Sequence, residues 1–182
     1  STLYLIEPMV DLAELLLSVT PPSHEKVFFV NSGTEAVETA LMLATNYSNS
    51  NRIVSMTNAY HGRSFAAVAV TGLPGYSVTS FSPFDVKFSP YGNIERLKSL
   101  VTESDGQIAA IIVEPIQGVN GFETPADKFF QDVRKICDDH RIVLISDEVQ
   151  TGFGRTGEAM WGIEAAGADA DLMVMAKGLG NG

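Results

Sequence analysis

Cysteine is almost absent from this chain of 182 residues, in which Cys137 is the only one. One cysteine excludes an intramolecular disulfide, so we expect a reducing compartment: the cytoplasm, or the mitochondrial matrix if a transit peptide is missing. The three histidines, His24, His61 and His140, have no metal-ligand spacing relative to Cys137, and we expect no metal site. Cys137 falls on the apolar side of a predicted helix, where a small buried residue is expected.

Basic residues are also scarce. The chain has 12 Lys and Arg against 22 Asp and Glu, which gives a formal net charge of −10. Nucleic acids and anionic membranes both require clustered Lys and Arg, so this balance argues against either partner. The sequence has no apolar run long enough to span a bilayer and no signal-peptide pattern at its start. We therefore expect neither a nucleic-acid partner nor a membrane partner.

What the chain does have is an alternation of apolar strands and helices. We expect helices over residues 8–17, 34–47, 94–101 after Asn93, and from Thr124-Pro125 onward, and strands over 27–30, 53–56, 66–70, 108–113, 142–145 and 172–175. The later strands are apolar throughout, which is typical of strands that helices cover on both faces. Strand–helix–strand order then predicts an α/β domain with a mostly parallel sheet.

Distinctive polar residues follow four of these strands. In open α/β sheets ligands bind beyond the carboxyl ends of the strands, so these residues are the candidates for a site. They are Asn31 to Ala36, Glu114, Ser146 to Glu148, and Lys177. We expect one helix start, two acids and one lysine to converge at one edge of the sheet.

Ser32-Gly33-Thr34 opens a predicted helix directly after an apolar segment. Free backbone N–H groups and the helix dipole favour a phosphate at such a place, and the glycine permits close approach of the backbone. An ordinary Ser/Thr helix cap explains the same residues. The sequence alone leaves both interpretations open.

Asp147 and Lys177 each follow an apolar strand. A buried acid at Asp147 needs a cationic partner, either the protonated pyridine nitrogen of a bound ligand or a structural Arg or Lys. A desolvated Lys177 would have a lowered pKa, and its neutral amine could form imines; a surface lysine is the alternative. We expect Glu148 to be solvated or to cap a helix.

Tyr60-His61-Gly62-Arg63 lies in a predicted loop after another strand. The Tyr60 ring could stack on a planar ligand, and Arg63 could bind a carboxylate with two hydrogen bonds. An ordinary half-buried tyrosine is the alternative for Tyr60. For His61 we expect a structural role rather than that of a catalytic base.

Together these stretches resemble the class III (omega-amino-acid-type) aminotransferases of the fold-type I pyridoxal-phosphate superfamily. The stretches that carry the resemblance are Asn31-Ser32-Gly33-Thr34-Glu35-Ala36, Tyr60-His61-Gly62-Arg63, Glu114-Pro115-Ile116-Gln117-Gly118, Asp147 through Gly157, and Ala176-Lys177-Gly178. They occur in the family's order across nearly the whole chain. The resemblance implies a single domain over residues 1–182 that makes up most of the cofactor-binding large domain, without the small C-terminal domain.

The resemblance also implies a role for each matching residue toward pyridoxal 5'-phosphate. Lys177 would form the aldimine with the cofactor and shuttle protons, and Asp147 would pair with the pyridine nitrogen. Gln150 would lie near the phenolic oxygen, and Tyr60 would stack on the ring. The phosphate would be held by a group of three neighbours, Ser32, Gly33 and Thr34.

The reaction implied is transfer of an amino group from an amino acid or omega-amine to a 2-oxo acid in a homodimer, with Arg63 and Glu114 beside the substrate. The sequence after Gly118 is Val119-Asn120-Gly121, which resembles the alanine–glyoxylate aminotransferase 2 branch more than the other branches. Arg63 is instead shared with the acetylornithine and 4-aminobutyrate branches, so the substrate stays open. The alternative is a catalytically incompetent fragment with a structural or interaction role.

Overall fold

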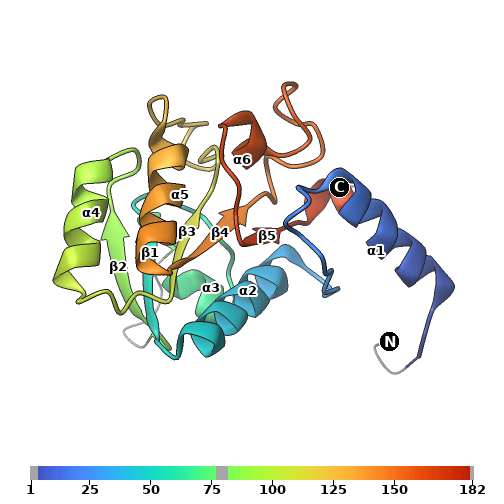
Figure 1. Cartoon of the computed structure of the whole chain (residues 1–182), viewed down its shortest axis with the longest axis horizontal. Coiled ribbons are helices and arrows are strands. Elements are labelled where there is room, and N and C mark those ends of the chain that lie inside the picture. The colour runs from blue at the N-terminus through green and yellow to red at the C-terminus, as the bar shows by residue number, and fades with distance from the viewer. Residues whose placement is uncertain (1–3, 77–81, 181–182) are drawn as a thin grey trace.

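The chain folds around a five-stranded parallel sheet, as the computed structural model shows for residues 4–76 and 82–180 (Figure 1). The strands are β1 (Arg52–Met56), β2 (Asp85–Ser89), β3 (Ala110–Val113), β4 (Val143–Asp147) and β5 (Leu172–Val174). They lie in the order β2-β1-β3-β4-β5, and all neighbouring pairs are parallel. The predicted α/β class with a mostly parallel sheet is confirmed.

Helices cover both faces of the sheet. They are α1 (Glu7–Val19), α2 (Gly33–Ser48), α3 (Phe65–Ala69), α4 (Ile94–Glu103), α5 (Phe129–His140), α6 (Gly162–Ala165) and the 3-10 turn η1 (Lys177–Gly180). Side chains of adjacent strand residues point to opposite faces, so Ile111 lies in the core formed with α4 and α5, while Ile112 lies in the core formed with α2 and α3. Burial on both faces explains why these strands are apolar throughout.

The register of the strands brings their carboxyl ends to the same level. Val113 at the end of β3 pairs with Ser146, and Asp147 at the end of β4 pairs with Val174 in β5. Glu114, Asp147 and the segment that leads to Lys177 therefore leave the sheet at one edge. This is the arrangement that the sequence predicted for the candidate site.

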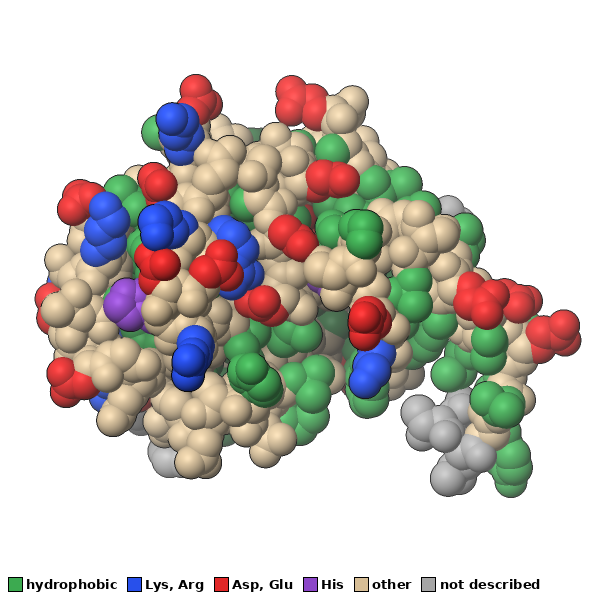
Figure 2. All heavy atoms as spheres, viewed as in Figure 1, with side chains coloured by type: hydrophobic (Ala, Val, Ile, Leu, Met, Phe, Trp, Pro, Cys, Tyr) green, Lys and Arg blue, Asp and Glu red, His purple; other side chains and the backbone are tan. Residues whose placement is uncertain are grey.

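Helix α1 lies to one side of the sheet in Figure 1, and Leu16 is its only buried residue. Its apolar side chains are therefore partly open to solvent, as the hydrophobic surface on this helix in Figure 2 shows; Val10 and Leu15 are 43% and 62% exposed. The indole Nε1 of Trp161 donates a hydrogen bond of 2.6 Å to the carbonyl oxygen of Val19, which holds the end of the helix. No helix among the described residues combines the length and apolarity needed to cross a membrane.

Two predicted strands are wrong. Residues 27–30 form no strand, because this short segment pairs with no strand of the sheet and instead lines the cavity described below. Residues 66–69 fall instead on helix α3 and Val70 is its C-cap, since alanine favours helix and Ser64 occupies the N-cap position. The sequence prediction also missed strand β2, whose polar and apolar residues alternate, and the short helix α6.

The start of α5 was also predicted wrongly. The helix begins at Phe129 rather than at Thr124-Pro125, because Lys128 adopts a left-handed conformation with a φ of 71° and separates the two segments. The predicted buried position of Cys137 on this helix is confirmed, and burial raises the pKa of its thiol to about 12. Asn93 caps α4 as expected, accepting a hydrogen bond from the backbone N–H of Arg96.

Candidate functional site

One cavity of about 1210 Å³ lies at the carboxyl edge of the sheet and extends toward α1. Its volume exceeds the roughly 300–1,000 Å³ of common small-molecule sites, so it has room for a cofactor together with a substrate. The residues that the sequence singled out all line it: Ser32, Gly33, Thr34, Tyr60, Arg63, Glu114, Asp147, Gln150 and Lys177. Residues up to 145 positions apart in the sequence thus share one cavity.

The start of α2 forms one wall of the cavity. The Ser32 side chain caps the helix by accepting a hydrogen bond of 3.3 Å from the N–H of Glu35, so the helix-cap interpretation is correct. The next two backbone N–H groups, those of Gly33 and Thr34, have no acceptor among the described residues. Such groups at a helix N-terminus favour an anion. The cap and an anion site are therefore compatible in the same turn.

The first turn of α2 packs so closely against other segments that position 33 requires a glycine. A Cβ atom on Gly33 would lie 3.1 Å from the Cβ of Ala176 and 3.3 Å from a methyl of Val149. The start of α2 consequently packs against the residue before Lys177 and against the segment after Asp147. This close packing brings the lysine, the acid and the helix start together.

The hydroxyl of Thr34 is already engaged by Ser64, a residue that the sequence prediction missed. The two hydroxyl oxygens are 2.6 Å apart, and the N–H of Ser64 donates to Thr34 Oγ1 at 3.2 Å. The backbone N–H of Thr34, rather than its hydroxyl, is therefore the free donor toward the cavity. A helix cap at Ser64 would have been visible in the sequence if residues 65–69 had been recognised as helical.

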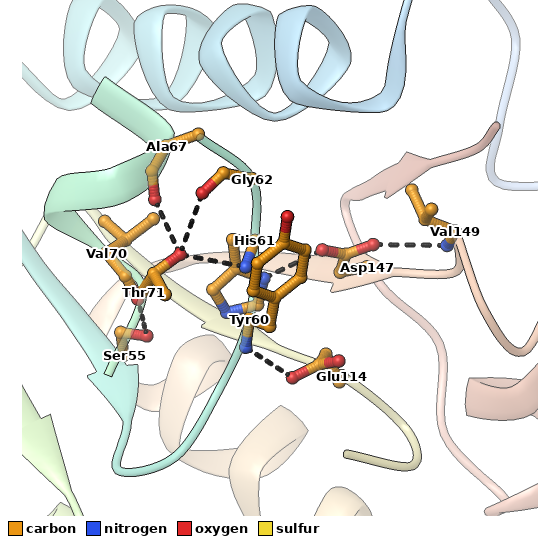
Figure 3. A network of polar contacts seen from close by, with 10 residues as sticks. All are labelled: Ser55, Tyr60, His61, Gly62, Ala67, Val70, Thr71, Glu114, Asp147 and Val149. Carbon is orange, nitrogen blue, oxygen red and sulfur yellow. Dashed lines mark hydrogen bonds and ion pairs between the residues drawn. The ribbon is translucent and has the colours of Figure 1, made fainter. Parts of the chain in front are cut away.

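Asp147 is buried at the end of β4, with 4% of its surface exposed. One carboxylate oxygen accepts from the N–H of Val149 at 3.1 Å, and the other lies 2.8 Å from Nδ1 of His61 (Figure 3). The protein partner of this acid is thus a histidine, where the sequence had suggested an Arg or a Lys. The buried position of His61 agrees with the structural role expected for it.

Tyr60 connects two other members of the site. Its backbone N–H donates to Oε2 of Glu114 at 2.9 Å (Figure 3), and its hydroxyl accepts from Nε of Arg63 at 3.1 Å. The Arg63 guanidinium also lies 5.9 Å from the ring centre of Tyr76, which the sequence prediction did not single out. No carboxylate among the described residues pairs with Arg63, so its charge remains available at the cavity.

Glu114 is a buried acid between charged neighbours. Burial raises its pKa to about 7, opposed by the attraction of His61 and reinforced by the repulsion of Asp147. The hydrogen bond from Tyr60 and the attraction of Lys177 act in the lowering direction. A carboxyl group with a pKa near 7 changes its protonation state near neutral pH.

Lys177 and Gln150 line the cavity, and both side chains are exposed. Of the two alternatives that the sequence left open for Lys177, the structure has the exposed lysine rather than the desolvated one. Lys177 begins η1 with a φ of 34°. Gly118 packs against Gln150, since a Cβ there would lie 3.0 Å from Gln150 Nε2.

Glu148 is buried, with only 1% of its surface exposed, so the expectation of a solvated side chain is wrong and that of a helix cap is correct. Its carboxylate accepts from the N–H groups of Gly162 and Ile163, both at 2.8 Å, at the start of α6. It also accepts from the hydroxyls of Ser146 and Thr151. Four donors thus fix the loop that follows Asp147. The described residues contain no group of three or more potential metal-ligating side chains.

The sequence of this chain is similar to those of known proteins over its whole length. The family described as aminotransferase class-III matches residues 1–182. Acetylornithine aminotransferases are similar over the whole chain: that of Methanopyrus kandleri is 38% identical and that of Methanothermobacter thermautotrophicus 40% identical. The chain covers 46% and 45% of these two proteins, so it spans about half the length of the curated relatives it matches.

Solved transaminase structures have the same fold. A transaminase from the marine bacterium Virgibacillus superposes with a TM-score of 0.93 at 32% identity, over 98% of this chain and 44% of its own. An S-selective transaminase from Arthrobacter sp. gives a TM-score of 0.88 at 30% identity, over 98% of this chain and 45% of its own.

Proposed function

Because the chain belongs to the class-III aminotransferase family, we propose that it forms the pyridoxal-phosphate-binding centre of a transaminase. The proposed reaction moves an amino group from an amino acid or omega-amine to a 2-oxo acid. The observation that carries this proposal is the convergence of Lys177, Asp147 and the start of α2 on one cavity. Residues 1–182 would then be most of the cofactor-binding domain of that enzyme.

The residues of the cavity fit this cofactor. The unpaired N–H groups of Gly33 and Thr34 suit its phosphate, and the Asp147 carboxylate suits a protonated ring nitrogen. Tyr60 offers an aromatic face for the ring, and Lys177 supplies the amine for the covalent bond. The exposed amide of Gln150 is the group proposed to lie at the phenolic oxygen.

When bound, pyridoxal phosphate supplies an electron sink for the charge that develops on the substrate carbon. The protein has three tasks in this chemistry. Asp147, whose carboxylate is fixed by two hydrogen bonds, would stabilise a positive charge on the ring nitrogen. The Lys177 amine would take a proton from the substrate carbon and return one. Tyr60 and the start of α2 would hold the ring and the phosphate in place.

The amino donor is proposed to carry a carboxylate that Arg63 binds. The guanidinium lacks an acidic partner among the described residues and is oriented by the Tyr60 hydroxyl. A planar guanidinium with free donors matches a carboxylate. The similar proteins named acetylornithine aminotransferases favour an omega-amino donor of that type. We also propose a homodimer, as the family resemblance suggests, and a cytoplasmic location, as the single cysteine suggests.

Cofactor trapping tests the proposed function. The full-length protein is mixed with pyridoxal phosphate, its visible absorbance is recorded, the mixture is reduced with borohydride, and the modified lysine is mapped by mass spectrometry. We expect a label on Lys177 and none after Lys177→Ala. Lys135, which is exposed on α5 and paired with Asp139, provides the matched control; Lys135→Ala should leave the labelling unchanged.

Three outcomes separate the alternatives. Labelling of Lys177 together with transfer of an amino group to a 2-oxo acid supports a working transaminase. Labelling without transfer to any tested 2-oxo acid would instead favour a catalytically incompetent protein that retains the cofactor site. A Lys177→Ala protein that transaminates at the parent rate would refute the mechanism.

A further inference from the structure

Tyr76 contacts two residues that line the cavity, but the proposed function gives it no task. Its ring centre lies 5.3 Å from that of Tyr60, and the two ring planes are at 82°. The Cζ atom of Arg63 lies over the same ring, 5.9 Å from its centre. Arg63 in turn donates its Nε–H to the Tyr60 hydroxyl at 3.1 Å. The three side chains therefore form a closed cluster of pairwise contacts.

A tight turn brings Tyr76 to this place. In residues 73–76, the N–H of Tyr76 donates to the carbonyl oxygen of Leu73 at 3.2 Å. Gly75 has a φ of 88° and follows Pro74. Proline followed by a residue of positive φ is typical of a type II turn, which glycine accommodates without strain. The sequence of this turn thus sets the direction in which the chain presents Tyr76.

The turn is held against the loop after β1. The carbonyl oxygen of Gly72 accepts a hydrogen bond from the N–H of Asn58 at 3.0 Å. The hydroxyl of Thr71 accepts from the N–H of His61, also at 3.0 Å (Figure 3). These two bonds join neighbouring residues of the two segments. The position of Tyr76 relative to the loop is therefore fixed by the backbone.

Arg63 depends on such neighbours because its side chain is long and exposed. Holding a rotamer-rich side chain in one direction costs conformational entropy. The described residues offer it no carboxylate partner, and the Tyr60 hydroxyl engages only its Nε–H. The face of the Tyr76 ring supplies a second contact, since the negative face of an aromatic ring attracts a cation. The terminal nitrogens of the guanidinium stay free to pair with a carboxylate.

We infer that Tyr76 is a positioning residue that sets the preference for amino donors with a carboxylate, by holding the Arg63 guanidinium in place. The inference rests on the proposed function, in which Arg63 binds that carboxylate. With Nε–H engaged by Tyr60, the carboxylate pairs with the two terminal nitrogens, which the Tyr76 ring orients. Tyr76 acts through Arg63 and touches neither the substrate nor the cofactor.

Two amines of equal length test the inference in the full-length protein loaded with pyridoxal phosphate. β-Alanine has a carboxylate where propylamine has a methyl group. The half-saturating concentration of propylamine divided by that of β-alanine, measured in the first half-reaction, gives the carboxylate preference. Loss of an exposed cation–π contact corresponds to a factor of about two to five. We expect Tyr76→Leu to lower the preference by that factor with the value for propylamine unchanged, and Tyr76→Phe, which retains the ring, to keep the preference.

Three further measurements separate this role from a structural one. Tyr47 is an exposed tyrosine in the last turn of α2, and Tyr47→Leu should leave the preference unchanged. In an Arg63→Gln background, Tyr76→Leu should have no further effect on the preference, because the two residues act as one unit. On the cofactor-free protein, nitrogen-15 relaxation of the Arg63 Nε–H group should show a less ordered guanidinium in Tyr76→Leu than in the parent or in Tyr76→Phe.

A Tyr76→Leu protein with the parent's preference and an equally ordered Arg63 would overturn the inference. A further loss of preference in the Arg63→Gln background would overturn it too, and so would a Tyr76→Phe protein that loses as much as Tyr76→Leu. If the parent is labelled on Lys177 but does not prefer β-alanine, the inference fails while the cofactor site stands. A parent that binds no pyridoxal phosphate would overturn the proposed function itself.

Discussion

Gly62 and Thr34 approach each other so closely that a Cβ atom at Gly62 would overlap the Thr34 side chain. Gly62 also has a φ of 135°, a backbone conformation open essentially to glycine alone. The glycine therefore lets the loop that carries Tyr60 and His61 lie directly against the start of α2. Two walls of the cavity are joined at this contact.

Replacing this glycine should loosen both walls. We expect Gly62→Ala to lower the free energy of unfolding by about 1–3 kcal/mol, because alanine is strained at this φ and its methyl displaces Thr34. Pyridoxal-phosphate binding should weaken in parallel. Urea unfolding and cofactor titration measure the two effects. Gly106→Ala is the control, because Gly106 has a φ of 70° but no atom near its Cβ position. Equal effects of the two substitutions would refute the steric argument.

The carboxylate of Glu148 should contribute strongly to stability. Its two oxygens accept four hydrogen bonds in a buried place, so Glu148→Ala would leave the N–H groups of Gly162 and Ile163 without partners. We expect a loss of about 3–5 kcal/mol in the free energy of unfolding. Glu148→Gln should also destabilise the protein, because its amide nitrogen would face donors. Chemical denaturation provides the measurement.

The exposed Glu158 serves as the comparison for Glu148. Glu158→Ala should change the free energy of unfolding by less than about 0.5 kcal/mol, as surface substitutions usually do. A Glu148→Gln protein as stable as the parent would show that one oxygen alone carries the interactions.

Glu114 should make stability depend on pH. Its pKa is raised to about 7 by burial, against an ordinary 4.5. The folded protein therefore keeps this proton between these two values while the unfolded chain releases it. The free energy of unfolding accordingly falls as pH rises from about 4.5 to 7 and stays lower above. Glu114→Gln lacks this fall, so its stability relative to the parent should be greater at pH 8 than at pH 5, by up to about 3 kcal/mol.

Urea unfolding without added cofactor at the two pH values measures this difference. The exposed Glu123 provides a control, and Glu123→Gln should shift stability equally at both. An advantage of Glu114→Gln that is the same at pH 5 and pH 8 would contradict the assignment.

Local sequence patterns correctly predicted the features that depend on interactions between residues close together in the sequence. The buried strands and the cap at Asn93 follow from short-range patterns, and the candidate residues follow from the rule that sites lie at the carboxyl ends of strands. The partner of Asp147 was not predictable in this way, because His61 reaches it only through the order of the sheet. Residues 27–30 show the same limit: an apolar run becomes a strand only where a neighbouring strand is present.

The burial of Glu148 was missed for a related reason. A glutamate next to Asp147 is ordinarily solvated, and its four donors come from both sides of a loop whose path the sequence does not define. The strand β2 is different, since the alternation in Asp85–Ser89 was readable as a half-exposed strand. Contacts between distant segments, rather than weak local signals, account for most of the errors in the site.

Trp161 should control the attachment of α1. Its indole N–H donates to the Val19 carbonyl, and the ring packs 4.9 Å from the centre of Phe153. Trp161→Phe retains an aromatic ring but removes the donor, so we expect a loss of about 1 kcal/mol and faster amide hydrogen exchange in α1. Exchange in α5, which has five buried residues, serves as the internal reference and should change only through global stability. Because Leu16 is the only buried residue of α1, few other contacts can hold this helix. Unchanged exchange in α1 would show that the contacts of Leu16 suffice without the hydrogen bond.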